Sequence, residues 1–245
     1  MGVTIRGLRD EDVPAAVLVA LEGGSPDADA EYVSFVASAG RLLVAVDDRL
    51  VVGVAGSVPL GDATMVTDLF VAESCRGLGV GGRLLAAVTD GAWRRCTFSS
   101  DHPAALPAYA RLGMTPRWRL LTMRGIATGG AGPERAVRGG WRHERADLVA
   151  YFAGRGADVA PDVVVLRGAT TTVLRLVSDA PTAVLEQMLA TEPAGHPVEL
   201  SVPEHDPLVA WLAAHGFEIV DADVFCATDG VELDPRARCV HRGLC

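Results

Sequence analysis

The most constraining stretch of this sequence is a glycine-rich segment between a strand-like run and a helical pattern. Residues 65–71 are mostly apolar and predict a strand, and apolar side chains recur at helical spacing after it, which predicts a helix from about Gly82 to Trp93. The loop between them holds the glycines Gly77, Gly79, Gly81 and Gly82. Glycines let a backbone approach a ligand, and a helix N-terminus offers unpaired N–H groups, so this order favours a bound phosphate. Arg76 and Arg83 stand at the two ends of the loop, where they can add charge-assisted hydrogen bonds.

Two well-known phosphate loops do not fit this segment. The P-loop pattern GxxxxGK[ST] requires a lysine, and the chain contains no lysine. The dinucleotide pattern GxGxxG also fails, because Leu84 stands where the third glycine would fall. A glycine-rich turn that binds no ligand remains the alternative interpretation.

The segment Arg-Gly-Leu-Gly-Val-Gly at residues 76–81 resembles the (Q/R)xxGx(G/A) pyrophosphate loop of the GNAT superfamily of acyl-CoA N-acyltransferases. The preceding Asp-Leu-Phe-Val at residues 68–71 is similar to the fourth strand of that family. The resemblance implies an α/β (α+β) fold with a mixed, mainly antiparallel sheet flanked by helices. It also implies that acetyl-CoA is the cosubstrate, without a metal, and that these residues bind it: Leu69, Phe70, Val71, Arg76, Gly77, Leu78, Gly79, Val80, Gly81, Gly82, Arg83 and His102.

A second motif follows at residues 102–114, where a helix is expected after a strand at residues 96–100. It is similar to the pattern NxxAxxxYxxxGF of the same family, with His102 in place of the asparagine and Met114 in place of the phenylalanine. The resemblance implies that Tyr109 protonates the departing thiolate, because a phenol stays protonated at neutral pH. A packed helix tyrosine is the alternative for Tyr109, and a simple helix start is the alternative for His102.

The general base is harder to assign than the acid. Some relatives place a glutamate on the strand before the tyrosine helix, but Thr97 stands at that spacing here. Asp68 is our catalytic candidate because it lies on the expected central strand, and Asp101 is the other carboxylate in reach. A structural role for Asp68, a water chain or an acceptor that is already neutral stays open.

We therefore expect an acetyltransferase that moves acetyl from acetyl-CoA to a primary amine of a small molecule or peptide by direct attack. A non-catalytic acyl-CoA sensor is the alternative function. The family resemblance implies that residues 22–39 help to cover the acceptor site. Six side chains there can contact a cationic acceptor or form a solvated face: Glu22, Asp27, Asp29, Glu31, Tyr32 and Phe35.

Composition narrows the partners and the compartment. The net charge of −9 disfavours nucleic acid and favours a cationic small molecule. The sequence contains no apolar run of ~18 residues, so we expect no membrane span. The five cysteines share no CxxC spacing, which fits a reducing cytoplasm. We expect a monomer or homodimer.

The chain is long enough for two domains. We predict a catalytic domain at residues 1–127, a glycine-rich linker at 128–140 and a smaller degenerate GNAT-like domain at 141–245. The first ~125 residues stop short of the final strands usual in a free-standing GNAT domain, so later residues are expected to complete or cover the sheet.

The second half repeats the first in degraded form. Aligning Gly216 with Gly113 without gaps pairs the strand at residues 198–202 with 95–99, and the helix at 182–190 with 79–87. Chance periodicity is the alternative. Asp179 then stands opposite Arg76 and Leu212 opposite Tyr109, and the counterpart loop has no glycine. An acidic helix start repels phosphate, so we expect one active site in the chain.

Overall fold

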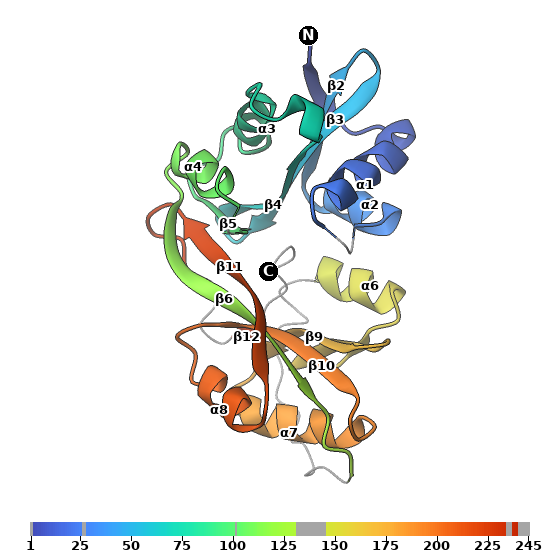
Figure 1. Ribbon diagram of the computed structural model, residues 1–245, viewed down its shortest axis with the longest axis vertical. Coiled ribbons are helices and arrows are strands. Elements are labelled where there is room, and N and C mark those ends of the chain that lie inside the picture. Colours follow the sequence, from blue (N-terminus) through green and yellow to red (C-terminus); the bar gives the residue numbers. More distant parts are fainter. Residues whose placement is uncertain (1, 26–27, 101, 131–145, 234–236, 240–245) are drawn as a thin grey trace. The chain divides into compact units, whose positions relative to one another are not determined.

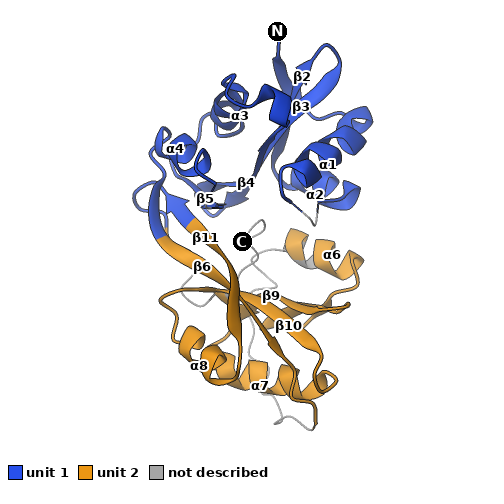
Figure 2. Cartoon of the chain, viewed as in Figure 1, with its two compact units in different colours: residues 1–117, 225–231 blue, residues 118–224, 232–245 orange. Residues whose placement is uncertain are grey.

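The computed structural model describes residues 2–25, 28–100, 102–130, 146–233 and 237–239, and it divides into two compact units (Figures 1 and 2). Unit 1 comprises Met1–Arg117 and Phe225–Val231, and unit 2 comprises Trp118–Val224 and Glu232–Cys245. This division differs from the expected limit at residue 127, because one long strand, β6 (Thr115–Ile126), runs from unit 1 into unit 2. Of the expected linker at 128–140, residues 131–140 lie outside the described residues.

Unit 1 is built on a mixed sheet with the strand order β1-β2-β3-β4-β5. Its strands are β1 (Thr4–Gly7), β2 (Arg41–Asp47), β3 (Leu50–Leu60), β4 (Ala63–Val71) and β5 (Arg95–Ser99). Neighbouring strands of this series are antiparallel except β4 and β5, which are parallel and are connected by a helix. The end of β11 (Glu218–Ala227) lies next to β5. This confirms that later residues complete the sheet of the first unit.

Helices cover both faces of the unit 1 sheet (Figure 1). They are α1 (Val13–Glu22), α2 (Ala30–Ala39), α3 (Val80–Val88) and α4 (Ala105–Ala110), with 3-10 turns η1 (Asp10–Asp12) and η2 (Glu73–Cys75). A Cβ built on Gly53 of β3 would meet Leu84 of α3, whereas one on Gly56 would meet Val36 of α2. Since these two glycines point to opposite faces of β3, α2 and α3 lie on opposite sides of the sheet.

In unit 2 the strand order of the sheet continues as β11-β6-β10-β9-β8-β7, and β12 pairs with β9. Its remaining elements are α6 (Ala146–Gly154), β7 (Asp158–Val159), β8 (Val163–Leu166), β9 (Thr171–Val177), α7 (Pro181–Thr191), β10 (Pro197–Pro203), α8 (Leu208–Ala214) and β12 (Ala237–Cys239). The apolar face of α7 is buried in the core of this unit. None of the helices in the described ranges is long and apolar enough to cross a membrane.

The order of elements in unit 2 repeats that of unit 1. The series β8-β9-α7-β10-α8 matches β3-β4-α3-β5-α4, and β9 runs parallel to β10 as β4 does to β5. Both units also have a β-bulge at the same place. Thr67 is the extra residue of β4 in its pairing with β3, and Leu174 is the extra residue of β9 in its pairing with β8. Gly113 and Gly216 follow α4 and α8 with φ of 79° and 80°. The structure thus confirms the repeated elements.

Candidate active site

The second half of β4 has an open edge. β5 pairs with β4 only from Thr64 to Val66, whereas β3 follows β4 as far as Val71. The bulge at Thr67 lies where the β4–β5 pairing stops, and a bulge bends its strand and increases the local twist. On the side away from β3, residues 69–71 therefore have no strand partner within the described ranges. The Val71 carbonyl oxygen is bonded by Arg76 Nε, and the other main-chain groups on that side can face a ligand.

The glycine loop lies directly after this edge and before α3. Gly77 and Gly79 have φ of 79° and 76°, a left-handed conformation that glycine adopts without steric cost. Gly79 is the N-cap of α3, and no side chain caps the helix there. A Cβ on Gly77, Gly79 or Gly82 would meet nothing within 4 Å, so the space over the loop is open. An uncapped helix start with exposed N–H groups fits an anionic group such as a pyrophosphate.

The helix after the loop differs slightly from its predicted extent. We expected it to run from about Gly82 to Trp93, and it runs from Val80 to Val88. The left-handed Gly79 starts the helix two residues earlier, and the turn at Gly91, with φ of 78°, follows its end. The earlier start brings Val80 and Gly81 into the first helical turn, next to β4.

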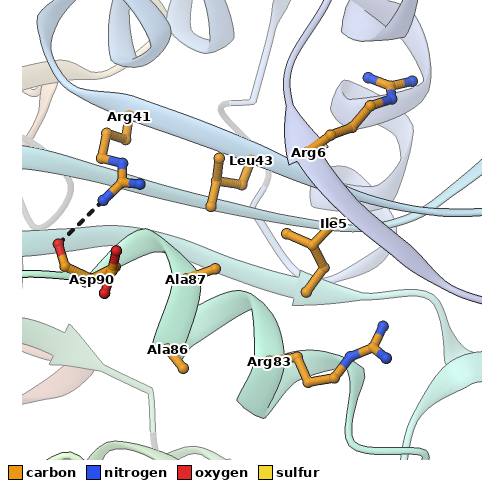
Figure 3. Close-up of a pocket in the computed structure, with 8 residues that line it drawn as sticks. All are labelled: Ile5, Arg6, Arg41, Leu43, Arg83, Ala86, Ala87 and Asp90. Carbon is orange, nitrogen blue, oxygen red and sulfur yellow. Dashed lines mark hydrogen bonds between the residues drawn. The ribbon is translucent and has the colours of Figure 1, made fainter.

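The two arginines at the ends of the loop make specific main-chain contacts. Arg76 Nε donates to the Val71 carbonyl oxygen at 3.0 Å, and Arg83 Nη2 donates to the Val3 carbonyl oxygen at 2.8 Å. Each guanidinium keeps further donors beyond this bond. Arg83 points into a surface groove between α3 and strands β1 and β2 (Figure 3), which is lined by Ile5, Arg6, Arg41, Leu43, Arg83, Ala86, Ala87 and Asp90. Arg83 is the only residue shared by that groove and the predicted cofactor site.

Asp68 is a buried carboxylate on β4. Its side chain is held by two hydroxyl groups: Thr67 Oγ1 donates to Oδ2 at 2.7 Å, and the Tyr32 phenol donates to the same oxygen at 2.9 Å. Burial raises the pKa of Asp68, and the two hydroxyl bonds act in the opposite direction. A carboxylate with a raised pKa is a stronger proton acceptor than an exposed one, as a general base requires.

Tyr109 and His102 differ in their surroundings. Tyr109 is buried on α4, with 7% of its surface exposed, and its carbonyl oxygen accepts hydrogen bonds from the N–H groups of Leu112 and Met114. His102 is exposed, and its Nδ1 accepts a hydrogen bond from Ala104 N at 3.2 Å. Ala104 is the N-cap residue of α4, and no side chain caps the helix there. Asp101, the other carboxylate considered as a base, lies outside the described residues.

In unit 2 the strand edge that corresponds to the open edge of β4 is paired with another strand of the same unit. β9 pairs with β10 from Thr171 to Val173, and beyond the bulge β12 pairs with Leu176 and Val177. By strand pairing and bulge position, Leu176 corresponds to Leu69 of β4. The residue after the bulge is a buried arginine, Arg175, where unit 1 has Asp68. Within its described residues, unit 2 therefore has no counterpart of the open edge, the glycine loop or the carboxylate of unit 1.

Sequence patterns did not reveal how Asp68 is held. Tyr32 was expected only as one of several acceptor-side residues, and the bond to Asp68 joins positions 36 residues apart. Thr67 and Gly56 carry no motif at all, and only the bulge places the Thr67 hydroxyl beside the carboxylate. The described residues contain no group of three or more His, Cys, Asp or Glu side chains that could hold a metal ion.

Comparison with known proteins supports the class for part of the chain. Residues 38–115, which include β4, the glycine loop and α4, match the family model described as an acetyltransferase (GNAT) domain. This match of residues 38–115 supports the resemblance to the GNAT superfamily that the loop and tyrosine motifs predicted. No protein of curated function matches it by sequence.

Solved structures extend the fold similarity to the whole chain. A proposed acetyltransferase from Pyrococcus horikoshii has a TM-score of 0.73 at 16% identity, covering 98% of this chain and 94% of that one. A tandem GNAT protein from the clavulanic acid biosynthesis pathway has a TM-score of 0.63 at 17% identity, covering 95% and 100%. A GCN5-related N-acetyltransferase from Sphaerobacter thermophilus has a TM-score of 0.60 at 15% identity, covering 94% and 98%. At these identities the likeness concerns the fold, and it agrees with two GNAT-like units in one chain.

Proposed function

We propose that unit 1 transfers an acetyl group from acetyl-CoA to a primary amine of a small molecule or peptide. The observation that carries the proposal is the open edge of β4 at residues 69–71, which runs directly into a glycine loop and an uncapped helix start. A family match to a GNAT acetyltransferase domain supports the acyl-transfer class. The amine acceptor and its size are our inference.

The residues of the loop suit the phosphate end of the cosubstrate, and the open edge suits its acyl end. N–H groups at Gly79, Val80 and Gly81 would bind the pyrophosphate, with Arg76 contributing donors that Val71 leaves unused. The bound cosubstrate supplies an acetyl group activated as a thioester. Main-chain N–H groups of residues 69–71 would stabilise negative charge on the thioester oxygen as the amine adds.

Two side chains would move the protons. Asp68 accepts a proton from the attacking amine, and its raised pKa favours that role. Tyr109 gives its phenolic proton to the departing sulfur and recovers it from solvent. Because the amine adds directly, the protein forms no covalent intermediate. The acidic character of the chain, with a net charge of −9, supports a cationic acceptor over an anionic one.

The test is incubation with labelled acetyl-CoA and a mixed library of primary amines, read by mass spectrometry. We expect at least one acetylated amine together with stoichiometric release of CoA thiol. If no amine is acetylated, calorimetry with CoA distinguishes a protein that binds CoA without transferring acetyl from one that does not bind CoA. Tight CoA binding without any acetylated amine would indicate the acyl-CoA sensor, and absence of CoA binding would reject both functions.

A further inference from the structure

The two oxygens of the Asp68 carboxylate have unequal surroundings. Both hydroxyl donors, from Tyr32 and Thr67, are bonded to Oδ2. No group in the described ranges donates a hydrogen bond to Oδ1. A carboxylate held through one oxygen keeps the other free to accept a proton, and the two bonds fix where that oxygen points.

The backbone around this carboxylate is shaped to admit it. A Cβ on Gly56 of β3 would lie 2.5 Å from Thr67 Oγ1 and 2.9 Å from Asp68 Oδ2, so any larger residue there would displace both groups. A helix cap fixes the main chain of Tyr32. Asp29 is the N-cap of α2, and its Oδ1 accepts a 2.7 Å hydrogen bond from Tyr32 N in the first turn of that helix. Gly56 and the cap of α2 are therefore two separate features that serve one arrangement.

Among the residues that the structure describes, no charged side chain contributes to the shift in the pKa of Asp68. Burial raises the pKa of Asp68, and the hydrogen bonds from the hydroxyls of Thr67 on β4 and Tyr32 on α2 lower it. The neighbouring strand β3 presents Gly56, and Phe70, two residues further along β4, packs against Gly23 at the end of α1. Removal of one hydroxyl is therefore expected to act on Asp68 without a second ionisable partner to compensate.

We propose that Tyr32 is a positioning residue for acyl transfer: its phenol, with the Thr67 hydroxyl, holds Asp68 Oδ2 and leaves Oδ1 to take the proton of the acceptor amine. This inference rests on the proposed acetyl transfer and deepens it. It places the acceptor amine on the α2 side of β4, the face opposite α3. It also gives Tyr32 a role that is separate from direct contact with the acceptor.

The test is the pH dependence of kcat/KM for Tyr32→Phe, measured by thiol release with acetyl-CoA and a fixed mixture of n-butylamine, phenethylamine and lysine amide. Loss of a hydroxyl bond to the charged carboxylate should move the acid limb to higher pH and lower kcat/KM on that limb about five- to tenfold. Thr67→Val should move the limb in the same direction, and Thr67→Ser, which keeps a hydroxyl, should restore it. Asp68→Asn should remove the limb.

Tyr151→Phe on α6 is the matched control and should leave the limb in place. Circular dichroism and the Kd for CoA report whether each variant is folded with an intact cosubstrate site. An equal loss of activity at every pH in Tyr32→Phe, or an unmoved limb in both Tyr32→Phe and Thr67→Val, would overturn the positioning role while leaving acetyl transfer intact. A wild-type protein that transfers no acetyl group to any amine would reject the proposed function itself.

Discussion

Thr228 and Arg95, 133 residues apart, are joined by three hydrogen bonds. Thr228 N donates to the Arg95 carbonyl oxygen and Arg95 N donates to Thr228 Oγ1, both at 2.9 Å, and Thr228 Oγ1 donates to the Arg95 carbonyl oxygen at 3.3 Å. They lie in the same compact unit, where the end of β11 neighbours β5. Phe225 of β11 is buried and lies with its ring centroid 5.3 Å from that of Phe98 on β5. The sheet that carries the candidate site is thus completed by residues far along the chain.

We predict that a chain truncated after residue 127 does not fold cooperatively. It lacks Phe225, Cys226 and Ala227, which are all buried, and loss of one buried phenylalanine alone costs roughly 3–5 kcal/mol. That loss is a large part of the ~5–15 kcal/mol that a domain has in total. Thermal unfolding followed by circular dichroism checks this, with Met1–Arg117 joined to Phe225–Val231 by a flexible linker as the matched control. A sharp unfolding transition in the truncated chain would contradict the prediction.

Gly77→Ala and Gly79→Ala are expected to weaken CoA binding. Both positions have positive φ, where a Cβ costs about 1–2 kcal/mol, and the loop would shift to relieve that strain. Gly91→Ala is a matched control, because Gly91 has φ of 78° and equally open surroundings but lies after α3. Calorimetry should show a fall in CoA affinity of about tenfold for the loop variants, as 1.4 kcal/mol corresponds to tenfold, and unchanged affinity for Gly91→Ala. Equal effects in all three would assign the loss to general strain.

Tyr109→Phe should lower kcat by about 10²-fold or more, the range expected for loss of a general acid, with little change in the Kd for CoA. The ring keeps its buried volume, so the stability should change little. Stopped-flow or steady-state thiol release measures the rate, and Tyr151→Phe serves as the control for the substitution itself. Full activity in Tyr109→Phe would show that the tyrosine only packs.

Asp12→Asn should lower the stability of unit 1 at neutral pH. Arg6 donates to both carboxylate oxygens of Asp12, at 2.5 and 2.9 Å, and this pairing lowers the pKa of Asp12. A carboxylate with a lowered pKa stabilises the fold above its unfolded pKa, and that stability is lost as the pH falls through the folded value. The melting temperatures of variant and wild type should therefore differ at pH 7, begin to converge as the pH falls below about 4, and become equal only below the lowered folded pKa. Glu11→Gln, at an exposed position, should show no such difference.

CoA should bind with a stoichiometry of one per chain. The unit 2 counterpart of the open β4 edge is paired with β12 at Leu176 and Val177, and the start of α7 carries no glycine. Calorimetric titration of the full chain measures the stoichiometry directly. Two equivalents of bound CoA would contradict this prediction and would mean that the ligand displaces β12 from β9.

The parts of the site that sequence could predict are local. The glycine loop, its strand and its helix are adjacent in the chain, and each carries its own residue signal at Gly77, Gly79 and the apolar residues around them. The repeat was also visible, although the gapless alignment was correct only from α7 onward. Strand pairing equates Thr171 with Thr64, an offset four residues larger than that between Gly216 and Gly113, because the two loops differ in length.

The parts that sequence could not predict depend on distant pairings. The hydrogen bonds between Tyr32 and Asp68 and between Thr228 and Arg95 join segments that no periodicity connects. β12 spans only Ala237–Cys239, too short for an alternating pattern to identify a strand. The bulge at Thr67 left no signal either, because a bulge is a property of two strands in register and not of one.

The position of β11 also governs the order of events on the ribosome. A nascent chain that has emerged as far as Arg117 still lacks the strand that closes the edge beside β5, and that strand is translated only after nearly all of unit 2. Unit 1 therefore cannot complete its sheet until unit 2 has been synthesised, and premature termination anywhere in between should yield a polypeptide with an unpaired, aggregation-prone sheet edge.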